Sequence, residues 1–170
     1  EAKDIALRLD NYNAERQKIE QTVLEEALSL AEKEIDNPII IVSSDRWHAG
    51  VIGIVASRIK DKYSRPCILI GFDGVTGKGS GRSIDGIDLG SVVIAARQKG
   101  LIESGGGHKM AAGLTLQKKN LASLKKFLFE KIGLLMAQEN PKPTLYVDSI
   151  ITLNGANDEL VTAIQMVAPF

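Results

Sequence analysis

The stretch from residue 38 to residue 72 constrains the fold most, because two kinds of hydrophobic pattern alternate within it. Residues 38–44 (PIIIVSS) and 65–72 (RPCILIGF) are short, apolar, β-branched runs that are typical of buried strands. Between them, residues 51–63 place apolar side chains on one face at helical spacing. This strand–helix–strand succession predicts two parallel strands joined by a crossover helix.

The rest of the chain adds strands and helices to this unit. Asp73-Gly74 is a tight-turn signal, so residues 76–83 are expected to form a hairpin partner, although their glycines leave little to pack. Asp88 and Asn120 are positioned to cap helices. The other expected elements are helices at 88–98, 120–138 and from 157, and strands at 113–117 and 144–153. The prediction is an α/β fold with a mixed, partly parallel sheet flanked by helices.

Residues 2–35 predict one long helix, with apolar residues spaced three and four apart. Arg16 interrupts this apolar seam, and Asp36-Asn37-Pro38 ends the helix. Such a helix spans about 50 Å at 1.5 Å per residue, which is longer than a small domain is wide. We therefore expect a connector that joins the following domain to another body of the protein.

The composition excludes several classes of protein. No apolar run approaches the ~20 residues that a membrane span needs, and no leader-like segment opens the chain. The single cysteine, Cys67, fits a reducing, cytoplasmic compartment and is expected to be buried. Basic and acidic residues number 21 each, but residues 58–82 hold an excess of basic ones, which predicts a local basic face.

Residues 103–113 (ESGGGHKMAAG) place three glycines directly before a histidine. Successive N–H groups of so bare a backbone can converge on an anion, and His108 and Lys109 would add a hydrogen-bond donor and a positive charge. The alternative is a glycine-rich turn in which His108 only satisfies a neighbouring group, because glycine motifs are weak signals without their context. The residues alone leave both interpretations open.

A second glycine cluster, GKGSGRS at 77–83, alternates glycines with polar side chains. In a strand, residues two apart face the same side, so Lys78, Ser80 and Arg82 would form one row. A guanidinium and a hydroxyl in such a row suit phosphate binding. The alternative is a solvated edge strand whose charges discourage aggregation.

A third cluster, RWHAG, precedes the helix at 51–63. Trp47 could stack on a nucleic-acid base or could anchor the core, and the anchor is the commoner role. His48 could donate to a phosphate or cap the helix. The two histidines lie far apart in the sequence and no cysteine–histidine spacing of a zinc site occurs, so no metal centre is expected within this chain.

Three segments in order resemble the RecJ family of bacterial single-stranded-DNA exonucleases, within the DHH phosphoesterase superfamily. They are residues 47–70 (WHAGVIGIVASRIKDKYSRPCILI), 77–89 (GKGSGRSIDGIDL) and 104–116 (SGGGHKMAAGLTL). In that family they belong to the DHH-associated domain, and residues 9–20 (LDNYNAERQKIE) resemble the connector before it. The resemblance covers about residues 10–170.

The resemblance implies a 5′-to-3′ exonuclease that acts on single-stranded DNA in recombination and repair. In such enzymes a DHH domain binds manganese or magnesium, and the DHH-associated domain closes over the cleft and holds the substrate's phosphates. Ser80 and Arg82 would bind the 5′-terminal phosphate or its neighbour. Further DNA contacts are expected from Lys78, Lys109, Trp47 and His48. The residues expected to face the phosphate near the metals are Gly105, Gly106, Gly107 and His108, with His108 as the candidate catalytic residue.

No Asp-His-His motif occurs in this chain, so the resemblance implies a partner DHH domain in the same polypeptide and no activity of this chain alone. The expected units are a connector helix at 1–37, the DHH-associated domain at 38–143, and the entry to a C-terminal oligonucleotide-binding region at 144–170. Two alternatives use similar motifs. One is a nano-RNA or cyclic-dinucleotide phosphodiesterase of the same superfamily, and the other is a non-catalytic nucleic-acid-binding module like the C-terminal domain of alanyl-tRNA synthetase.

Overall fold

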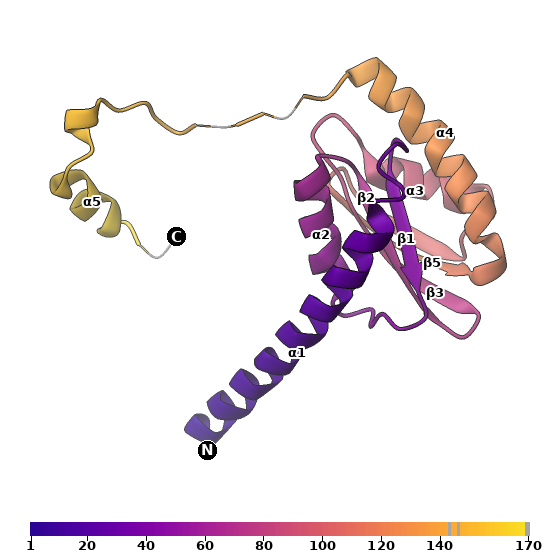
Figure 1. Ribbon diagram of the computed structural model, residues 1–170, viewed down its shortest axis with the longest axis horizontal. Coiled ribbons are helices and arrows are strands. Elements are labelled where there is room, and N and C mark those ends of the chain that lie inside the picture. The colour runs from indigo at the N-terminus through magenta and orange to yellow at the C-terminus, as the bar shows by residue number, and fades with distance from the viewer. Residues whose placement is uncertain (143, 146, 169–170) are drawn as a thin grey trace.

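A five-stranded sheet with helices on both faces forms the body of the protein (Figure 1). The computed structural model describes residues 1–142, 144–145 and 147–168. The strands are β1 (Ile40–Ser44), β2 (Cys67–Asp73), β3 (Thr76–Arg82), β4 (Ser104–His108) and β5 (Ala111–Gln117). The helices are α1 (Ala2–Ala31), α2 (Ile52–Tyr63), α3 (Leu89–Gln98), α4 (Leu121–Glu139) and α5 (Asp158–Gln165), with 3₁₀ turns η1 (Lys118–Asn120) and η2 (Leu153–Gly155).

The strand–helix–strand unit forms as predicted. β1 and β2 pair in parallel, with Ile41 beside Ile68, and α2 connects them. β2, β3, β5 and β4 then pair antiparallel in the order β1-β2-β3-β5-β4. Gly74, with a φ of +58°, turns the chain between β2 and β3 in a left-handed conformation that glycine adopts without strain. The predicted mixed, partly parallel sheet is therefore confirmed.

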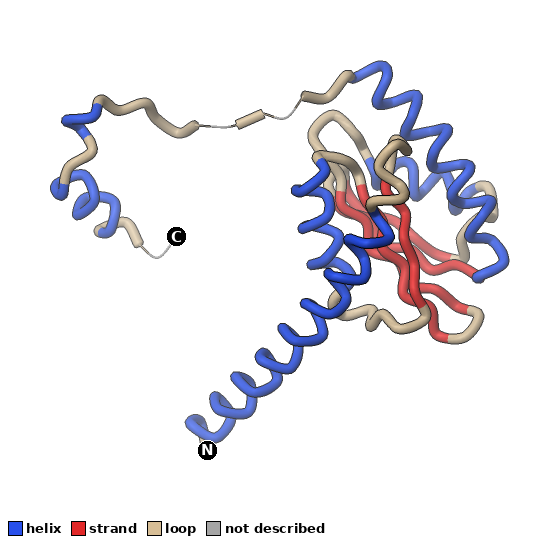
Figure 2. The backbone as a smooth tube through the Cα atoms, in the orientation of Figure 1, coloured by secondary structure: helices blue, strands red, loops and turns tan. Residues whose placement is uncertain are grey.

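The sheet carries a hydrophobic core on each face, but the two cores differ in extent. α3 and α4 cover one face, where Leu114 of β5 and Leu89 of α3 are buried together. α1 and α2 cover the other face only over β1, β2 and part of β3, where Leu69 and Cys67 are buried (Figure 2). Burial also raises the pKa of the Cys67 thiol. On this second face the outer half of the sheet has no covering helix among the described residues.

β3 lies at the centre of the sheet, so the alternative of a solvated edge strand is wrong. Its glycines, expected to pack poorly, instead face the α3 and α4 layer and are buried. A β-carbon built on Gly79 would lie 2.8 Å from Leu114 Cδ1, and one on Gly81 would lie 2.7 Å from Leu89 Cδ2. The glycines are needed because the core side chains come so close to the strand backbone.

α1 ends at Ala31, and turns follow where the sequence predicts helix to residue 35. The first half of α1 is exposed and projects away from the sheet (Figure 1). Contact with the domain begins at buried Glu20, whose Oε2 accepts a 2.8 Å hydrogen bond from Arg16. Glu20 Oε1 lies 2.6 Å from Arg58 of α2, in an ion pair whose angles fall outside those of a hydrogen bond. Arg16 thus breaks the apolar seam because it pairs with a buried carboxylate.

Two local predictions are wrong and two are confirmed. Asn120 makes no side-chain cap hydrogen bond, because it lies in the 3₁₀ turn before α4, whereas Asp88 Oδ1 accepts from Ser91 N at 3.0 Å as expected. The strand predicted at 144–153 is absent from the described residues of that segment, and Tyr146 within it lies outside them. Without a neighbouring strand to pair with, side chains such as Ile150 are exposed. The helix predicted after residue 157 is α5, well separated from the sheet (Figure 1).

No helix in the part of the chain that the structure describes combines the length and the apolar character that crossing a bilayer requires.

The packing of β3 predicts a large difference between two glycine-to-alanine changes. Gly79→Ala should lower the free energy of unfolding by about 1–3 kcal/mol, because the methyl group collides with Leu114. Gly106→Ala in β4 is the matched control and should change it by about 0.5 kcal/mol or less, since no described atom lies within 4 Å of its added carbon. Urea denaturation measures both, and equal midpoints would contradict this account of β3.

Candidate functional site

Lys78, Ser80 and Arg82 project from β3 on the face opposite its buried glycines. Lys78 is exposed, and Ser80 and Arg82 are half-buried. Arg82 Nη1 donates to Ser80 Oγ at 3.2 Å and to the Gly81 carbonyl at 2.9 Å. The strand therefore presents the row of ammonium, hydroxyl and guanidinium groups that its alternating sequence predicts.

Helix α2 forms a wall beside this row. A β-carbon built on Gly53 would lie 3.0 Å from Arg82 Nη2 and 3.0 Å from Ser80 Oγ, so the helix approaches these groups through a glycine. Gly53 was not among the predicted site residues. The available signal was an isolated glycine inside an apolar helical pattern, which commonly marks close packing.

Small residues on β5 and β4 form a floor beside the row. Pairing places Ser80 beside Gly113, and Gly113 beside Gly106. A β-carbon on Gly113 would have one neighbour within 4 Å, the Gly79 carbonyl oxygen at 3.9 Å, and one on Gly106 would have none among the described atoms. Gly113 and Ala111 were not predicted as site residues, although the alternation in AAGLTL could have indicated that they share a face. We call this surface the open sheet face, made of Lys78, Ser80, Arg82, Ser104, Gly106, His108, Ala111, Gly113 and Thr115.

The three glycines before His108 form edge strand β4 and do not form an anion-binding nest. Gly105 faces the α3 layer, where an added β-carbon would lie 2.7 Å from Ile102 Cδ1, whereas Gly106 faces the open sheet face. Gly107, with a φ of +157°, has no room for a side chain, since a β-carbon would lie 2.2 Å from the Ala111 carbonyl oxygen. Their N–H groups therefore do not converge as expected, because strand pairing alternates their directions.

His108 and Lys109 separate at the end of β4. His108 is exposed and, paired with Ala111 beside Arg82, lies on the open sheet face. Two strand spacings, about 10 Å, separate the backbones of His108 and Arg82. Lys109 lies in the turn toward Asp88, whose pKa is lowered chiefly by the backbone hydrogen bond from Ser91 and also by the charge of Lys109.

Trp47 is buried at 4% exposure, and its Nε1 donates to Glu26 Oε2 at 3.0 Å. The ring is thus packed as a core anchor, the commoner of the two roles considered, and in this position it is not exposed for stacking on a base. His48 is exposed and accepts a hydrogen bond from Gly50 N at Nδ1, 3.1 Å away, which leaves the Nε2 proton as an outward donor. His48 and Lys78 line one cavity of about 590 Å³ beside the row.

The charges of the row are available to a ligand. Among the described residues, no ion pair involves Lys78 or Arg82. A guanidinium, a hydroxyl and an ammonium above a bare backbone suit an anion such as phosphate. No cluster of three or more His, Cys, Asp or Glu side chains able to hold a metal occurs in the described ranges.

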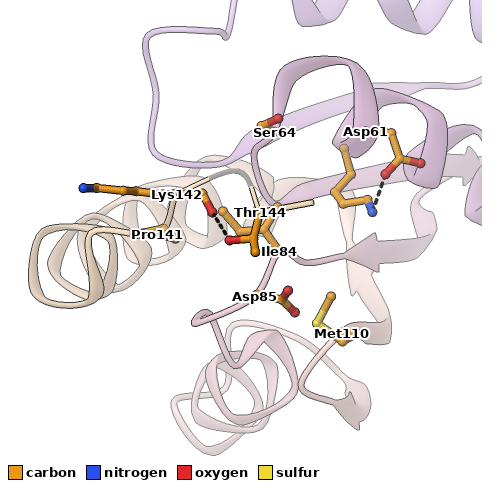
Figure 3. A pocket seen from close by; sticks show the side chains of 9 residues that line it. Asp61, Ser64, Ile84, Asp85, Met110, Pro141, Lys142 and Thr144 are labelled. Atoms are coloured by element: carbon orange, nitrogen blue, oxygen red, sulfur yellow. Dashed lines mark hydrogen bonds and ion pairs between the residues drawn. The ribbon is translucent and has the colours of Figure 1, made fainter. Parts of the chain in front are cut away.

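A second cavity, of about 230 Å³, lies away from the row (Figure 3). It is bordered by the end of α2, the segment after β3 and the segment after α4. Lys60 at its edge forms an ion pair with Asp61, so one of its two lysine charges is already neutralised. None of the residues predicted to bind substrate lines this cavity, so the candidate site remains the open sheet face.

Comparison with known proteins gives a consistent result. The DHHA1 domain family matches residues 36–134. Single-stranded-DNA-specific exonuclease RecJ of Bacillus subtilis is 34% identical over 173 residues, which span 100% of this chain and 22% of that protein. The Escherichia coli protein of that name is 40% identical over 126 residues, 69% of this chain and 22% of the relative. The crystal structure of RecJ in complex with Mn²⁺ from Thermus thermophilus has 27% identity and a TM-score of 0.78, over 96% of this chain and 24% of that one. The chain thus spans less than a third of these relatives.

The contact between α2 and Arg82 predicts a selective effect of Gly53→Ala. The methyl group displaces flexible side-chain ends, so the free energy of unfolding should change by about 1 kcal/mol or less. The affinity for inorganic phosphate should fall several-fold, because Arg82 and Ser80 move. Gly133→Ala in α4 is the control, since its added carbon makes ordinary 3.6 Å contact with Pro38. NMR titration with phosphate measures both variants, and equal affinities would contradict the proposed wall.

Proposed function

Because this chain belongs to the DHHA1 family, we propose that it is the substrate-phosphate-binding part of a RecJ-type 5′-to-3′ single-stranded-DNA exonuclease that acts in DNA recombination and repair. The observation that carries this proposal is the row of Lys78, Ser80 and Arg82 beside the glycine floor, whose charges form no ion pair among the described residues. The similarity to exonucleases named as specific for single-stranded DNA supports the same substrate.

In this proposal the open sheet face receives the phosphate backbone of a single strand. Arg82 and Ser80 bind the 5′-terminal phosphate or its neighbour, because a guanidinium can donate two parallel hydrogen bonds to phosphate oxygens. Lys78 and His48 contact an adjacent phosphate. Gly106 and Gly113 let the strand approach the sheet closely, and His108, across the floor from Arg82, contacts the phosphate that reacts.

The hydrolytic step needs a metal-activated nucleophile that a DHH domain of the same polypeptide would provide with manganese or magnesium. RecJ structures with Mn²⁺ or Mg²⁺ among the relatives support that choice of metal. Residues 1–37 then serve as the connector to the DHH domain, residues 38–143 as the phosphate-binding domain, and residues 144–170 as the entry to a C-terminal oligonucleotide-binding region. The relatives at 34–40% identity favour this function over a cyclic-dinucleotide phosphodiesterase or a tRNA-synthetase-like binding module.

Arg82→Ala in the full-length enzyme should raise KM for a 5′-phosphorylated oligonucleotide by about 10-fold to 100-fold, because a charged hydrogen bond to phosphate is lost. The melting temperature should change little, since Arg82 makes its described hydrogen bonds within its own strand. Lys126→Ala, which removes one positive charge on α4 behind the opposite face, is the control. Unchanged kinetics of the Arg82 variant would contradict the proposed phosphate contact.

The 170-residue chain by itself should digest no single-stranded DNA when Mn²⁺ is added, because the metal ligands belong to the DHH domain in this proposal. A gel assay with a labelled oligonucleotide measures digestion, and the full-length enzyme under the same conditions is the positive control. Metal-dependent digestion by the isolated chain would show that its own residues assemble a catalytic centre.

A further inference from the structure

One carboxylate of α1 collects three donors from the segment that joins β1 to α2. Glu26 accepts from Trp47 Nε1 at 3.0 Å, from Arg46 Nη2 at 2.7 Å and from Ser44 Oγ at 3.3 Å. The Glu26 side chain is 27% exposed, so these contacts lie at the boundary between α1 and the domain. Glu26 thus ties α1 to the segment 44–47 at three points.

The segment tied in this way borders the open sheet face. The Trp47 carbonyl packs over Gly71 so closely that a β-carbon there would lie 2.4 Å from its oxygen. His48, the next residue, lines the cavity that also contains Lys78. α2 begins a few residues later and brings Gly53 against Arg82. The position of Trp47 therefore determines the positions of both His48 and the wall formed by α2.

The contacts favour the ionised form of Glu26. Partial burial by itself would raise the pKa of this carboxyl, but the hydrogen bonds from Trp47 and Arg46, together with the charge of Arg46, outweigh burial and lower it. On the other side of the same segment, Lys118 Nζ lies 2.7 Å from Asp45 Oδ1. The segment is thus held by an ion pair with α1 on one side and by an ion pair with η1, directly after β5, on the other.

We propose that Glu26 is a positioning residue for the phosphate site: it fixes Trp47, and through it His48 and the α2 wall, in the arrangement that binds the substrate. This inference rests on the proposed function and deepens it, because it names a residue of α1 that acts on the site without touching the ligand. Under this proposal, the phosphate affinity of the domain also depends on the position of α1 against the domain.

Trp47 is the single tryptophan of the chain, so its fluorescence reports on the segment directly. Glu26→Ala in this chain should shift the emission to longer wavelength and raise acrylamide quenching about twofold or more. Glu26→Gln keeps an acceptor for Trp47 but loses the charge that Arg46 faces, and should give a smaller change. Glu25→Ala and Glu25→Gln are the matched controls, because Glu25 is exposed and contacts Gln21 of the same helix. Their fluorescence should equal that of the unchanged protein.

The functional measurements use both the enzyme and a simple anion. In the full-length enzyme, Glu26→Ala should raise KM for a 5′-phosphorylated oligonucleotide about 3-fold to 10-fold with kcat within twofold, and Glu26→Gln should lie between it and the unchanged enzyme. In this chain, Glu26→Ala should weaken inorganic phosphate binding by a similar factor. A purely structural role would lower the melting temperature without this split between KM and kcat.

The outcomes separate this inference from the proposed function. Phosphate affinity and Trp47 quenching of Glu26→Ala equal to those of Glu25→Ala would overturn the positioning role alone. The proposed function alone would be overturned by two results together. The chain without substitutions would bind inorganic phosphate, and the full-length enzyme would not digest single-stranded DNA. If Glu26→Ala does not fold, Glu26→Gln decides: quenching and phosphate affinity equal to those of Glu25→Gln would overturn the positioning role.

Discussion

The close packing of β3 against the α3 layer is the constraint on which the rest of the structure depends. Because β3 has glycine at every second position, the side chains of Leu114 from the neighbouring strand β5 and of Leu89 from α3 can lie directly against its backbone. The same alternation sends Lys78, Ser80 and Arg82 to the other face, where neighbouring strands hold their backbone on both sides. One strand thus anchors the core and presents the donors in fixed positions, which lowers the entropy lost when an anion binds.

The uncovered half of the sheet is stable in water because little apolar surface lies on it. Gly113, Gly106 and Ala111 offer almost no side chain that a helix could bury, so the hydrophobic effect does not favour a covering element there. On the opposite face of the same strands, Leu114 and Leu116 are buried under helices. The amino-acid sequence therefore separates the two faces of β5 residue by residue, one for packing and one for binding.

Much of this arrangement follows from local sequence patterns. The remaining parts depend on contacts between residues that are far apart in the chain. The apolar runs around residues 40 and 68 predict parallel strands, and the period of two in GKGSGRS predicts the row. The glycines of β4 have low strand propensity, so the local sequence does not predict a strand there. They form a strand because they pair with β5. Trp47 finds its acceptor in Glu26, 21 residues earlier on another element, which no local pattern indicates. The exposed segment after α4 shows that an apolar β-branched run needs a neighbour before it forms a strand.

The Glu20–Arg58 ion pair marks the place where α1 leaves the body of the domain. Eighteen residues of helix precede it from the start of α1, a rigid rod of about 27 Å at 1.5 Å per residue. A rod pivoting at one end magnifies rotation: about 10° at Glu20 displaces the far end by about 5 Å over that length. Glu26 lies on the short arm of this lever, beside the segment that carries His48. Because Glu26 lies six residues, or about 9 Å, beyond the pivot, the same rotation moves it by about 1.5 Å, roughly a third of the displacement at the far end.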